Sequence, residues 1–160
     1  MQNLSELTRR LIEGRVEFVL VGGFAAVAYG VTLVTRDVDI CVRFSEANLM
    51  GIQNAVADLH PVHRSRPDMP LALTPQQCRE LKDLYLKTDL GPLDCLGAVL
   101  GVGDFDAVWQ QSTEIELPPG RCRILEISAL ISAKKAMDRD HDRMALRQLE
   151  EIQKLLYGPK

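Results

Sequence analysis

Residues 19–42 read VLVGGFAAVAYGVTLVTRDVDICV, and this stretch decides the fold. An apolar run leads into Gly22-Gly23, a series of small residues of helical character follows, and a second apolar run holds Asp37 and Asp39. Successive side chains of a strand alternate between its two faces, so the two aspartates point the same way with Cα atoms roughly 6.5–7 Å apart. Like charges on a half-buried surface are unfavourable without a counter-charge between them. The spacing therefore predicts a cation site on this strand.

A third acid, Asp94, lies between Leu93 and Cys95 in another predicted strand. Three carboxylates that converge from neighbouring strands suit hard divalent cations, and we expect two Mg²⁺ ions, with Mn²⁺ as the alternative. Such a pair clamps the attacking and leaving oxygens of an in-line phosphoryl transfer, and the third acid can act as general base. The glycine pair lets the backbone approach a triphosphate. These features predict phosphoryl transfer.

Each of these residues also has a purely structural interpretation. Asp37 and Asp39 can be exposed acids on an edge strand, with Thr35-Arg36 beside them to supply a salt bridge. Asp94 can face solvent, and Gly22-Gly23 can form a tight turn. The apolar residues between and after the two aspartates favour a buried strand, and hence a metal site.

The composition is that of an ordinary globular protein. The chain has 160 residues, of which 46% are hydrophobic and 26% charged, enough for one domain with a sizeable core. The net charge of −3 is uneven, because residues 121–160 are basic and the rest acidic. No apolar run approaches the roughly 20 residues of a membrane span, and the N-terminal segment has no apolar signal stretch. We therefore expect a cytoplasmic protein with no membrane partner.

Cysteine spacing argues against a zinc site or a disulfide framework. The four cysteines form no CxxC pair, and two of them lie inside apolar runs, where a free thiol behaves as a small hydrophobe. The pattern predicts buried thiols at Cys41, Cys78, Cys95 and Cys122.

Hydrophobic periodicity predicts one α/β (α+β) domain over residues 1–160, with a core of about 16–127 and C-terminal helices of about 128–157. We expect a mixed sheet of about four or five strands flanked by helices, with no internal repeat. The stretch 64–75, rich in proline and charge, predicts a loop. Ser128 is expected to cap a helix that ends at Met137, and the charged break DRDHD precedes a last amphipathic helix.

Several of these motifs together resemble those of a known family. The glycine pair, a short helix, TRDVDI at 35–40 and LGPLD at 90–94 are similar to the polymerase-beta-type nucleotidyltransferase superfamily. LISAKKAMDRDHD at 130–142 resembles the L-I-x-x-K-x-x-x-x-R-x-K-D segment of small bacterial members, several of which belong to toxin–antitoxin or antibiotic-modifying groups. The resemblance covers most of residues 16–150. Its motif positions are occupied by Lys134, Arg139 and Asp142, with His141 where the family usually has lysine.

The resemblance implies a nucleotidyltransferase fold and Mg²⁺-dependent transfer of a nucleoside monophosphate from an NTP such as ATP to an acceptor hydroxyl, with release of pyrophosphate. The acceptor stays open between an RNA end, a protein hydroxyl and a small antibiotic, as does a homodimer or a cognate toxin–antitoxin partner. The implied roles are metal binding by Asp37, Asp39 and Asp94, activation of the acceptor by Asp94, and nucleotide contact by Gly22, Gly23, Lys134 and Arg139.

Departures from the family pattern keep other hypotheses open. Gly23 replaces the serine that commonly follows the first glycine, which removes a hydroxyl contact to phosphate. Lys134 can be a solvated helix lysine, and Arg139 and Asp142 can pair with each other. The second hypothesis is a non-catalytic nucleotide- or partner-binding module, such as a toxin–antitoxin component. A third is a metal-dependent phosphohydrolase, in which water replaces the acceptor.

Overall fold

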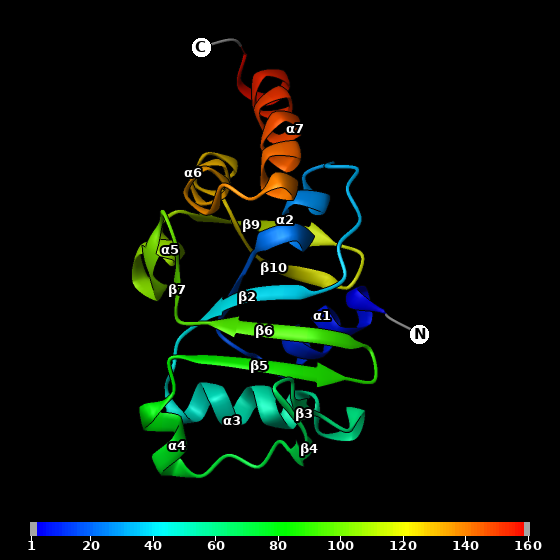
Figure 1. Cartoon of the computed structure of the whole chain (residues 1–160), viewed down its shortest axis with the longest axis vertical. Helices are drawn as coiled ribbons and strands as arrows, with labels where there is room; N and C mark the ends of the chain where they lie inside the picture. The colour runs from blue at the N-terminus through cyan, green and yellow to red at the C-terminus, as the bar shows by residue number, and fades with distance from the viewer. Residues whose placement is uncertain (1–2, 159–160) are drawn as a thin grey trace.

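Strand β1 (Phe18–Val21) forms the centre of the fold, and all four of its residues are buried. It pairs in parallel with β10 (Gly120–Leu125) and antiparallel with β2 (Val38–Val42). Because both faces of β1 are covered, its sequence is continuously apolar rather than alternating. The computed structural model of the chain describes residues 3–158, shown in Figure 1, so the ends of the predicted domain at 1–2 and 159–160 lie outside the described residues.

Within residues 3–158, eight strands form one sheet in the order β4-β3-β5-β6-β2-β1-β10-β9. The β1–β10 and β2–β6 pairs are parallel and the remaining pairs antiparallel, so the sheet is mixed. The predicted α/β class is confirmed, but the expected four or five strands were too few. The other strands are β3 (Val62–His63), β4 (Arg66–Pro70), β5 (Asp83–Thr88), β6 (Gly91–Leu96) and β9 (Ser112–Leu117), with β7 (Ala98–Val99) and β8 (Gly103–Asp104) forming a separate ladder.

The predicted loop at 64–75 was wrong, because part of it forms the edge strand β4. All five residues of β4 are exposed, so no alternation of apolar and polar residues marks it in the sequence. Its prolines lack an N–H donor, and an edge strand tolerates that loss because one of its sides needs no partner. A turn at 64–65 joins β3 to β4.

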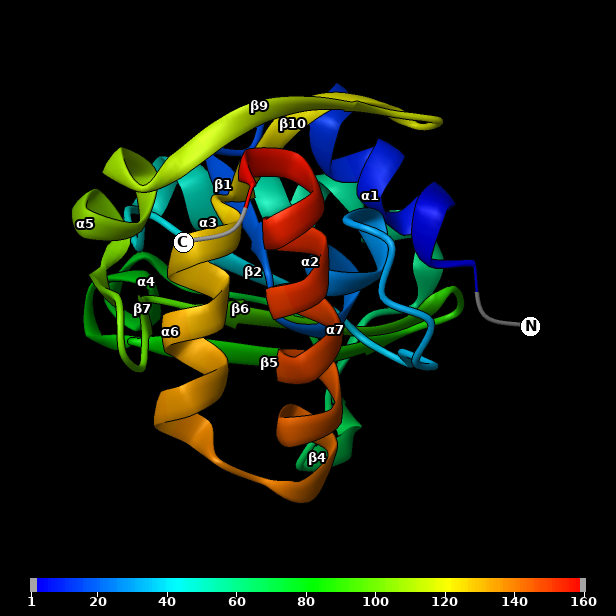
Figure 2. The same cartoon turned by 90° about the horizontal axis from the view of Figure 1, so that it is seen from above.

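Helices flank the sheet in two groups. Figures 1 and 2 show α6 and α7 side by side at one end of the molecule, with α3 and α4 at the opposite end in Figure 1. The helices are α1 (Leu4–Glu13), α2 (Gly22–Ala28), α3 (Glu46–Ala55), α4 (Pro75–Glu80), α5 (Phe105–Gln110), α6 (Ile127–Met137) and α7 (Asp140–Tyr157). None of the helices in the described range is long and apolar enough to cross a membrane.

The boundaries of the last two helices differ from the prediction. Ser128 does not cap α6, which starts one residue earlier and has Glu126 as its N-cap. The expected five-residue break is only two residues long, because Asp138 adopts a left-handed conformation (φ 50°) and Arg139 is extended. The chain therefore reverses sharply, and the end of α6 lies beside the start of α7.

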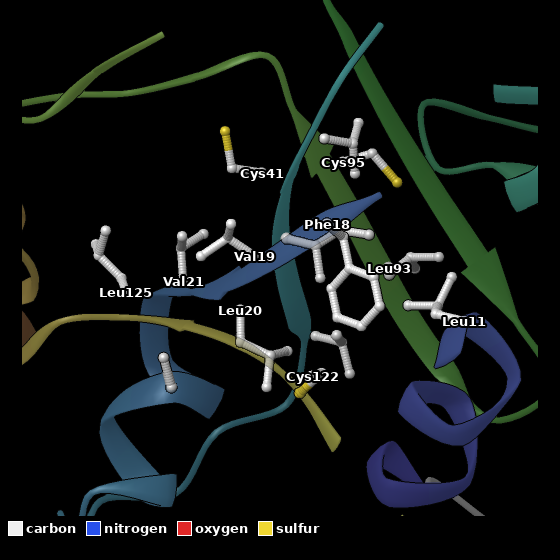
Figure 3. Close-up of a cluster of buried hydrophobic side chains, with 14 of the residues drawn as sticks. Leu11, Phe18, Val19, Leu20, Val21, Cys41, Leu93, Cys95, Cys122 and Leu125 are labelled. Atoms are coloured by element: carbon white, nitrogen blue, oxygen red, sulfur yellow. The ribbon is translucent and has the colours of Figure 1, made fainter. Parts of the chain in front are cut away.

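The core lies between the central strands and the helices. In Figure 3, Leu11 from α1 lies near Phe18 and Leu93 from the neighbouring strands. All four cysteines are buried and free, which confirms the prediction of buried thiols. Asp39 on β2 and Asp94 on β6 are only partly buried, although the residues on either side of each are buried.

Candidate active site

Asp37, Asp39 and Asp94 come together at the junction of β2 and β6. Asp39 and Asp94 are direct partners in the parallel pairing of these strands, and Asp37 directly precedes β2. One carboxylate oxygen from each of the three lies within 4.8 Å of the others. The predicted convergence is therefore present, although β2 begins at Val38 and not at Asp37.

The electrostatics of this cluster call for a cation. Burial, reinforced by the charges of Asp94 and Asp37, raises the pKa of Asp39 to about 7. Burial also raises the pKa of Asp94, an effect that the neighbouring Arg64 opposes. Three carboxylates at one point form a hard, all-oxygen donor set, which Mg²⁺ and Mn²⁺ prefer. The residues present therefore fit a divalent metal.

Gly22 makes room for this cluster. It has a positive φ of 70°, and a Cβ atom added to it would lie 2.2 Å from Asp39 Oδ2. Gly22 and Gly23 are the first residues of α2, so the expected turn before the helix is in fact its first turn. Glycine is required here by both backbone conformation and close approach to a carboxylate.

Gly23 is explained by Thr35. A Cβ atom on Gly23 would lie 2.9 Å from Thr35 Oγ1, so the threonine hydroxyl fills space next to position 23. That hydroxyl donates to the backbone carbonyl of Asp37 at 3.3 Å, and both Gly23 and Thr35 line the cleft described below. Thr35 thus places a hydroxyl next to position 23, which sequence analysis did not identify.

Lys134, Arg139 and Asp142 form an ion cluster where α6 meets α7, in which Lys134 and Asp142 are buried and Arg139 is exposed. The Asp142 side chain is fully buried and accepts from Lys134 Nζ at 3.1 Å and from Arg139 Nε at 2.5 Å. Lys134 is 6% exposed, so its interpretation as a solvated lysine was wrong, whereas pairing of Arg139 with Asp142 is confirmed. Burial alone would raise the pKa of Asp142, but the hydrogen bonds from Arg139 and Lys134 outweigh it and lower that pKa to about 2.

A sequence signal for this burial exists. Lys134 continues the buried stripe of Ile127, Leu130 and Ile131 along α6 at intervals of three, four and seven residues. Asp142 likewise stands at helical intervals before the buried Ala145 and Leu149 of α7. A charged residue on the apolar stripe of a helix needs a partner of opposite charge. The helical spacing of Lys134 and Asp142 could therefore have predicted that the two residues pair.

A cleft of about 610 Å³ joins these groups. It brings the three aspartates together with Gly23, Lys134 and Arg139, while Gly22 lies beneath Asp39. The remaining wall is largely apolar. Its lining residues are Ala26, Val27, Val31, Leu33, Val34, Thr35, Arg36, Tyr85, Leu96, Met137, His141 and Ala145.

Arg64 is the site residue that sequence reasoning missed. Its guanidinium group contacts both carboxylate oxygens of Asp94, with Nη1 at 3.2 Å from Oδ2 and Nη2 against Oδ1. Nη2 also lies 4.0 Å from Asp37 Oδ2. Only the pairing of β3 with β5 carries residue 64 to this point, and no local pattern in a stretch predicted as a loop indicates that pairing.

The mixed sheet, with a glycine-led helix after β1 and acids converging from β2 and β6, has a nucleotidyltransferase-type fold. Among solved structures, it is similar to TM1012 from Thermotoga maritima, described as a candidate nucleotidyltransferase, at 15% identity and a TM-score of 0.56 over 92% of this chain and 90% of that one. It is also similar to the antibiotic-resistance factor ANT(2'')-Ia, at 14% identity and a TM-score of 0.56 over 96% of this chain and 88% of that one. No protein-family profile and no curated protein sequence matches the chain. The expected fold is thus confirmed.

Gly22→Ala tests the close approach at the acidic cluster. The alanine backbone would have to adopt the left-handed conformation of Gly22, and its Cβ would displace the Asp39 carboxylate. We therefore expect a loss of about 2 kcal/mol or more in the free energy of unfolding. Gly51→Ala in α3 is the matched control, because its Cβ would lie 3.9 Å from the nearest atom. Urea unfolding of both variants measures the difference, and equal stabilities would contradict this account.

Asp142→Asn tests the buried ion cluster through its pH dependence. Since the pKa of Asp142 is lowered to about 2 in the folded chain, its carboxylate stabilises the fold above pH 4, and this contribution disappears as pH falls from about 4 to about 2. We expect the variant to lose about 2 kcal/mol at pH 7, with a smaller deficit at low pH. Asp140→Asn, at a 98% exposed side chain, is the control. A deficit in Asp142→Asn that is independent of pH would exclude the charge as its cause.

Proposed function

We propose that this chain is an Mg²⁺-dependent nucleotidyltransferase that moves a nucleoside monophosphate from an NTP to an acceptor hydroxyl and releases pyrophosphate. One observation carries the proposal: Asp37, Asp39 and Asp94 meet within 4.8 Å of one another at the floor of a cleft. The cleft volume of about 610 Å³ falls in the range of small-molecule sites, roughly 300–1,000 Å³. The similarity to nucleotidyltransferase-type structures supports the same conclusion.

The three aspartates are the proposed metal ligands. Bound Mg²⁺ or Mn²⁺ supplies the positive charge that the transferring phosphoryl group and the attacking hydroxyl need. Asp94 is only partly exposed and its pKa is raised, so its carboxylate is suited to take the proton of the acceptor hydroxyl. Asp39 on β2 and Asp37 directly before it would be the other protein ligands of the metal.

Positive charge from the helices completes the proposed triphosphate site. Lys134 and Arg139 line the cleft. The charge of Lys134 is close enough to Asp39 to offset part of the rise in its pKa that burial and the neighbouring aspartates cause. Asp142 holds both cations through the hydrogen bonds described above. Gly23 and the Thr35 hydroxyl offer a small, polar surface on the facing wall, where phosphate oxygens can approach closely.

A second candidate function has its own observation. In this structure Arg64 contacts both oxygens of Asp94, one of the proposed metal ligands. A chain that keeps this ion pair permanently would bind nucleotides or a partner without turnover. Calorimetry would then show NTP binding that does not depend on Mg²⁺, and no pyrophosphate would form.

Asp39→Asn is the test of the nucleotidyltransferase. Losing a metal ligand removes several kcal/mol of transition-state stabilisation, so we expect label transfer from α-³²P-labelled NTPs to fall roughly a thousandfold. The metal-free variant should also be more stable than the wild type at pH 8, because the half-buried cluster loses a repulsive charge. Glu116→Gln, at an exposed position on the edge strand β9, is the control for both measurements.

Label transfer that survives in Asp39→Asn would exclude the proposed metal site. Release of inorganic phosphate by the wild type in place of pyrophosphate would instead identify a phosphohydrolase. RNA, protein substrates and an antibiotic should each be offered as acceptors, since the proposal does not by itself choose among them.

A further inference from the structure

A row of polar residues crosses the sheet and continues past the metal site. Asp39 and Asp94 are partners across β2 and β6, and Asp94 and Tyr85 are partners across β6 and β5. On the far side of β5, Arg64 follows β3 and donates its backbone N–H to the Tyr85 carbonyl at 3.0 Å. Since directly paired residues share a face of the sheet, Tyr85 and Arg64 extend from Asp94 on the same face.

The guanidinium group of Arg64 is matched to a planar anion. It forms a two-pronged contact with Asp94, and its Nη2 atom is shielded from solvent. If Asp94 ligates a divalent cation, its oxygens are no longer available to Arg64, and a guanidinium next to that cation is repelled. An additional anion beside Arg64 removes both penalties. Phosphate is the anion whose geometry the guanidinium fork fits as well as it fits a carboxylate.

Tyr85 supplies the second half of this surface. Its side chain is 44% exposed and lines the cleft beside Asp94. An exposed aromatic ring next to an arginine is the arrangement that binds single-stranded nucleic acids, with the ring stacking on a base and the cation on the backbone. Lys87 lies two residues farther along β5 on the same exposed face, while the acidic Asp83 lies at its other end. The positive charge around Tyr85 therefore comes from Arg64 and Lys87.

We infer that the acceptor is the hydroxyl end of a nucleic acid strand, with Arg64 on a backbone phosphate and Tyr85 stacked on a base. This inference rests on the proposed function and names its acceptor. The strand's terminal hydroxyl oxygen forms a bond to the α-phosphorus of the NTP, and the bond from that phosphorus to the bridging oxygen breaks. Pyrophosphate leaves with the bonding electrons, and the hydroxyl proton passes to Asp94. A polycationic antibiotic would place ammonium groups against Arg64, and a protein hydroxyl brings no fixed anion.

Binding of a strand without turnover tests the inference directly. The probes are 5′-fluorescein-labelled single-stranded 12-mers of RNA and of DNA, titrated with the full chain in Mg²⁺ without NTP and followed by fluorescence anisotropy. We expect Arg64→Gln to weaken binding about tenfold or more, because a charge-assisted contact to phosphate is lost. Tyr85→Ala should weaken binding about fivefold or more and Tyr85→Phe should not, since stacking needs only the ring. The RNA and DNA arms identify which strand is the acceptor.

Controls separate a binding role from a structural one. Arg121→Ala removes an exposed arginine from β10, on the other side of β1, and should bind both strands as the wild type does. Arg64→Gln should bind Mn²⁺, measured by electron paramagnetic resonance, at least as tightly as the wild type, because a competing cation is removed from Asp94. Arg64→Lys keeps the charge without the fork and should lie between the wild type and Arg64→Gln in strand affinity.

Unchanged strand affinity in Arg64→Gln and Tyr85→Ala would overturn the inference. So would label transfer to kanamycin or to a protein hydroxyl but to neither oligonucleotide, although pyrophosphate release would then still support nucleotidyl transfer. A loss of Mn²⁺ binding in Arg64→Gln would assign that residue a structural role and would also overturn it. If the wild type binds no Mn²⁺ and releases no pyrophosphate with any acceptor, the proposed function fails, and this inference fails with it.

Discussion

The pairing of β2 with β6 places Asp39 directly beside Asp94, and much of the site depends on this contact between like charges. Two half-buried carboxylates repel each other, and Asp37 adds a third charge. This repulsion destabilises the fold, but the residues on the other face of the same strands pack in a continuous apolar core that offsets it. A folded chain that concentrates negative charge in this way is prepared for a cation.

The surroundings of the cluster answer that charge from two directions. Arg64 contacts Asp94 from the β3–β4 turn, and Lys134 lines the cleft from α6. The two cations differ in how they are held. Lys134 is fixed by the fully buried Asp142, whereas Arg64 has the carboxylates of the cluster itself as its partners. A metal ion would therefore compete with Arg64 and leave Lys134 in place.

Local patterns in the sequence contain the acids but not all of their neighbours. The alternation of Asp37 and Asp39 with valine and isoleucine predicts that both acids lie on one side of a strand, and the structure brings Asp94 to the same point. The glycine pair needs the structure for its explanation, because the space at Gly23 is taken by Thr35 from a loop. The burial of Lys134 follows from helical periodicity once α6 is placed, although the adjacent Lys135 is exposed.

Long-range pairing accounts for what the sequence did not predict. Arg64 reaches Asp94 because the short strand β3 pairs with β5. A strand of two residues has too little sequence pattern for its pairing partner to be predicted. All five residues of the edge strand β4 are exposed, so it too has no pattern of apolar residues from which a strand could be predicted. The number of strands was therefore too low in the prediction, while the central strands that carry the acids were correctly identified.

A crystal structure with Mn²⁺ and a non-hydrolysable NTP analogue tests the central claim most directly. The account predicts anomalous scattering density between the carboxylates of Asp37, Asp39 and Asp94, with Arg64 displaced from Asp94. Bound analogue with no anomalous density among these carboxylates, and Arg64 still paired with Asp94, would contradict it.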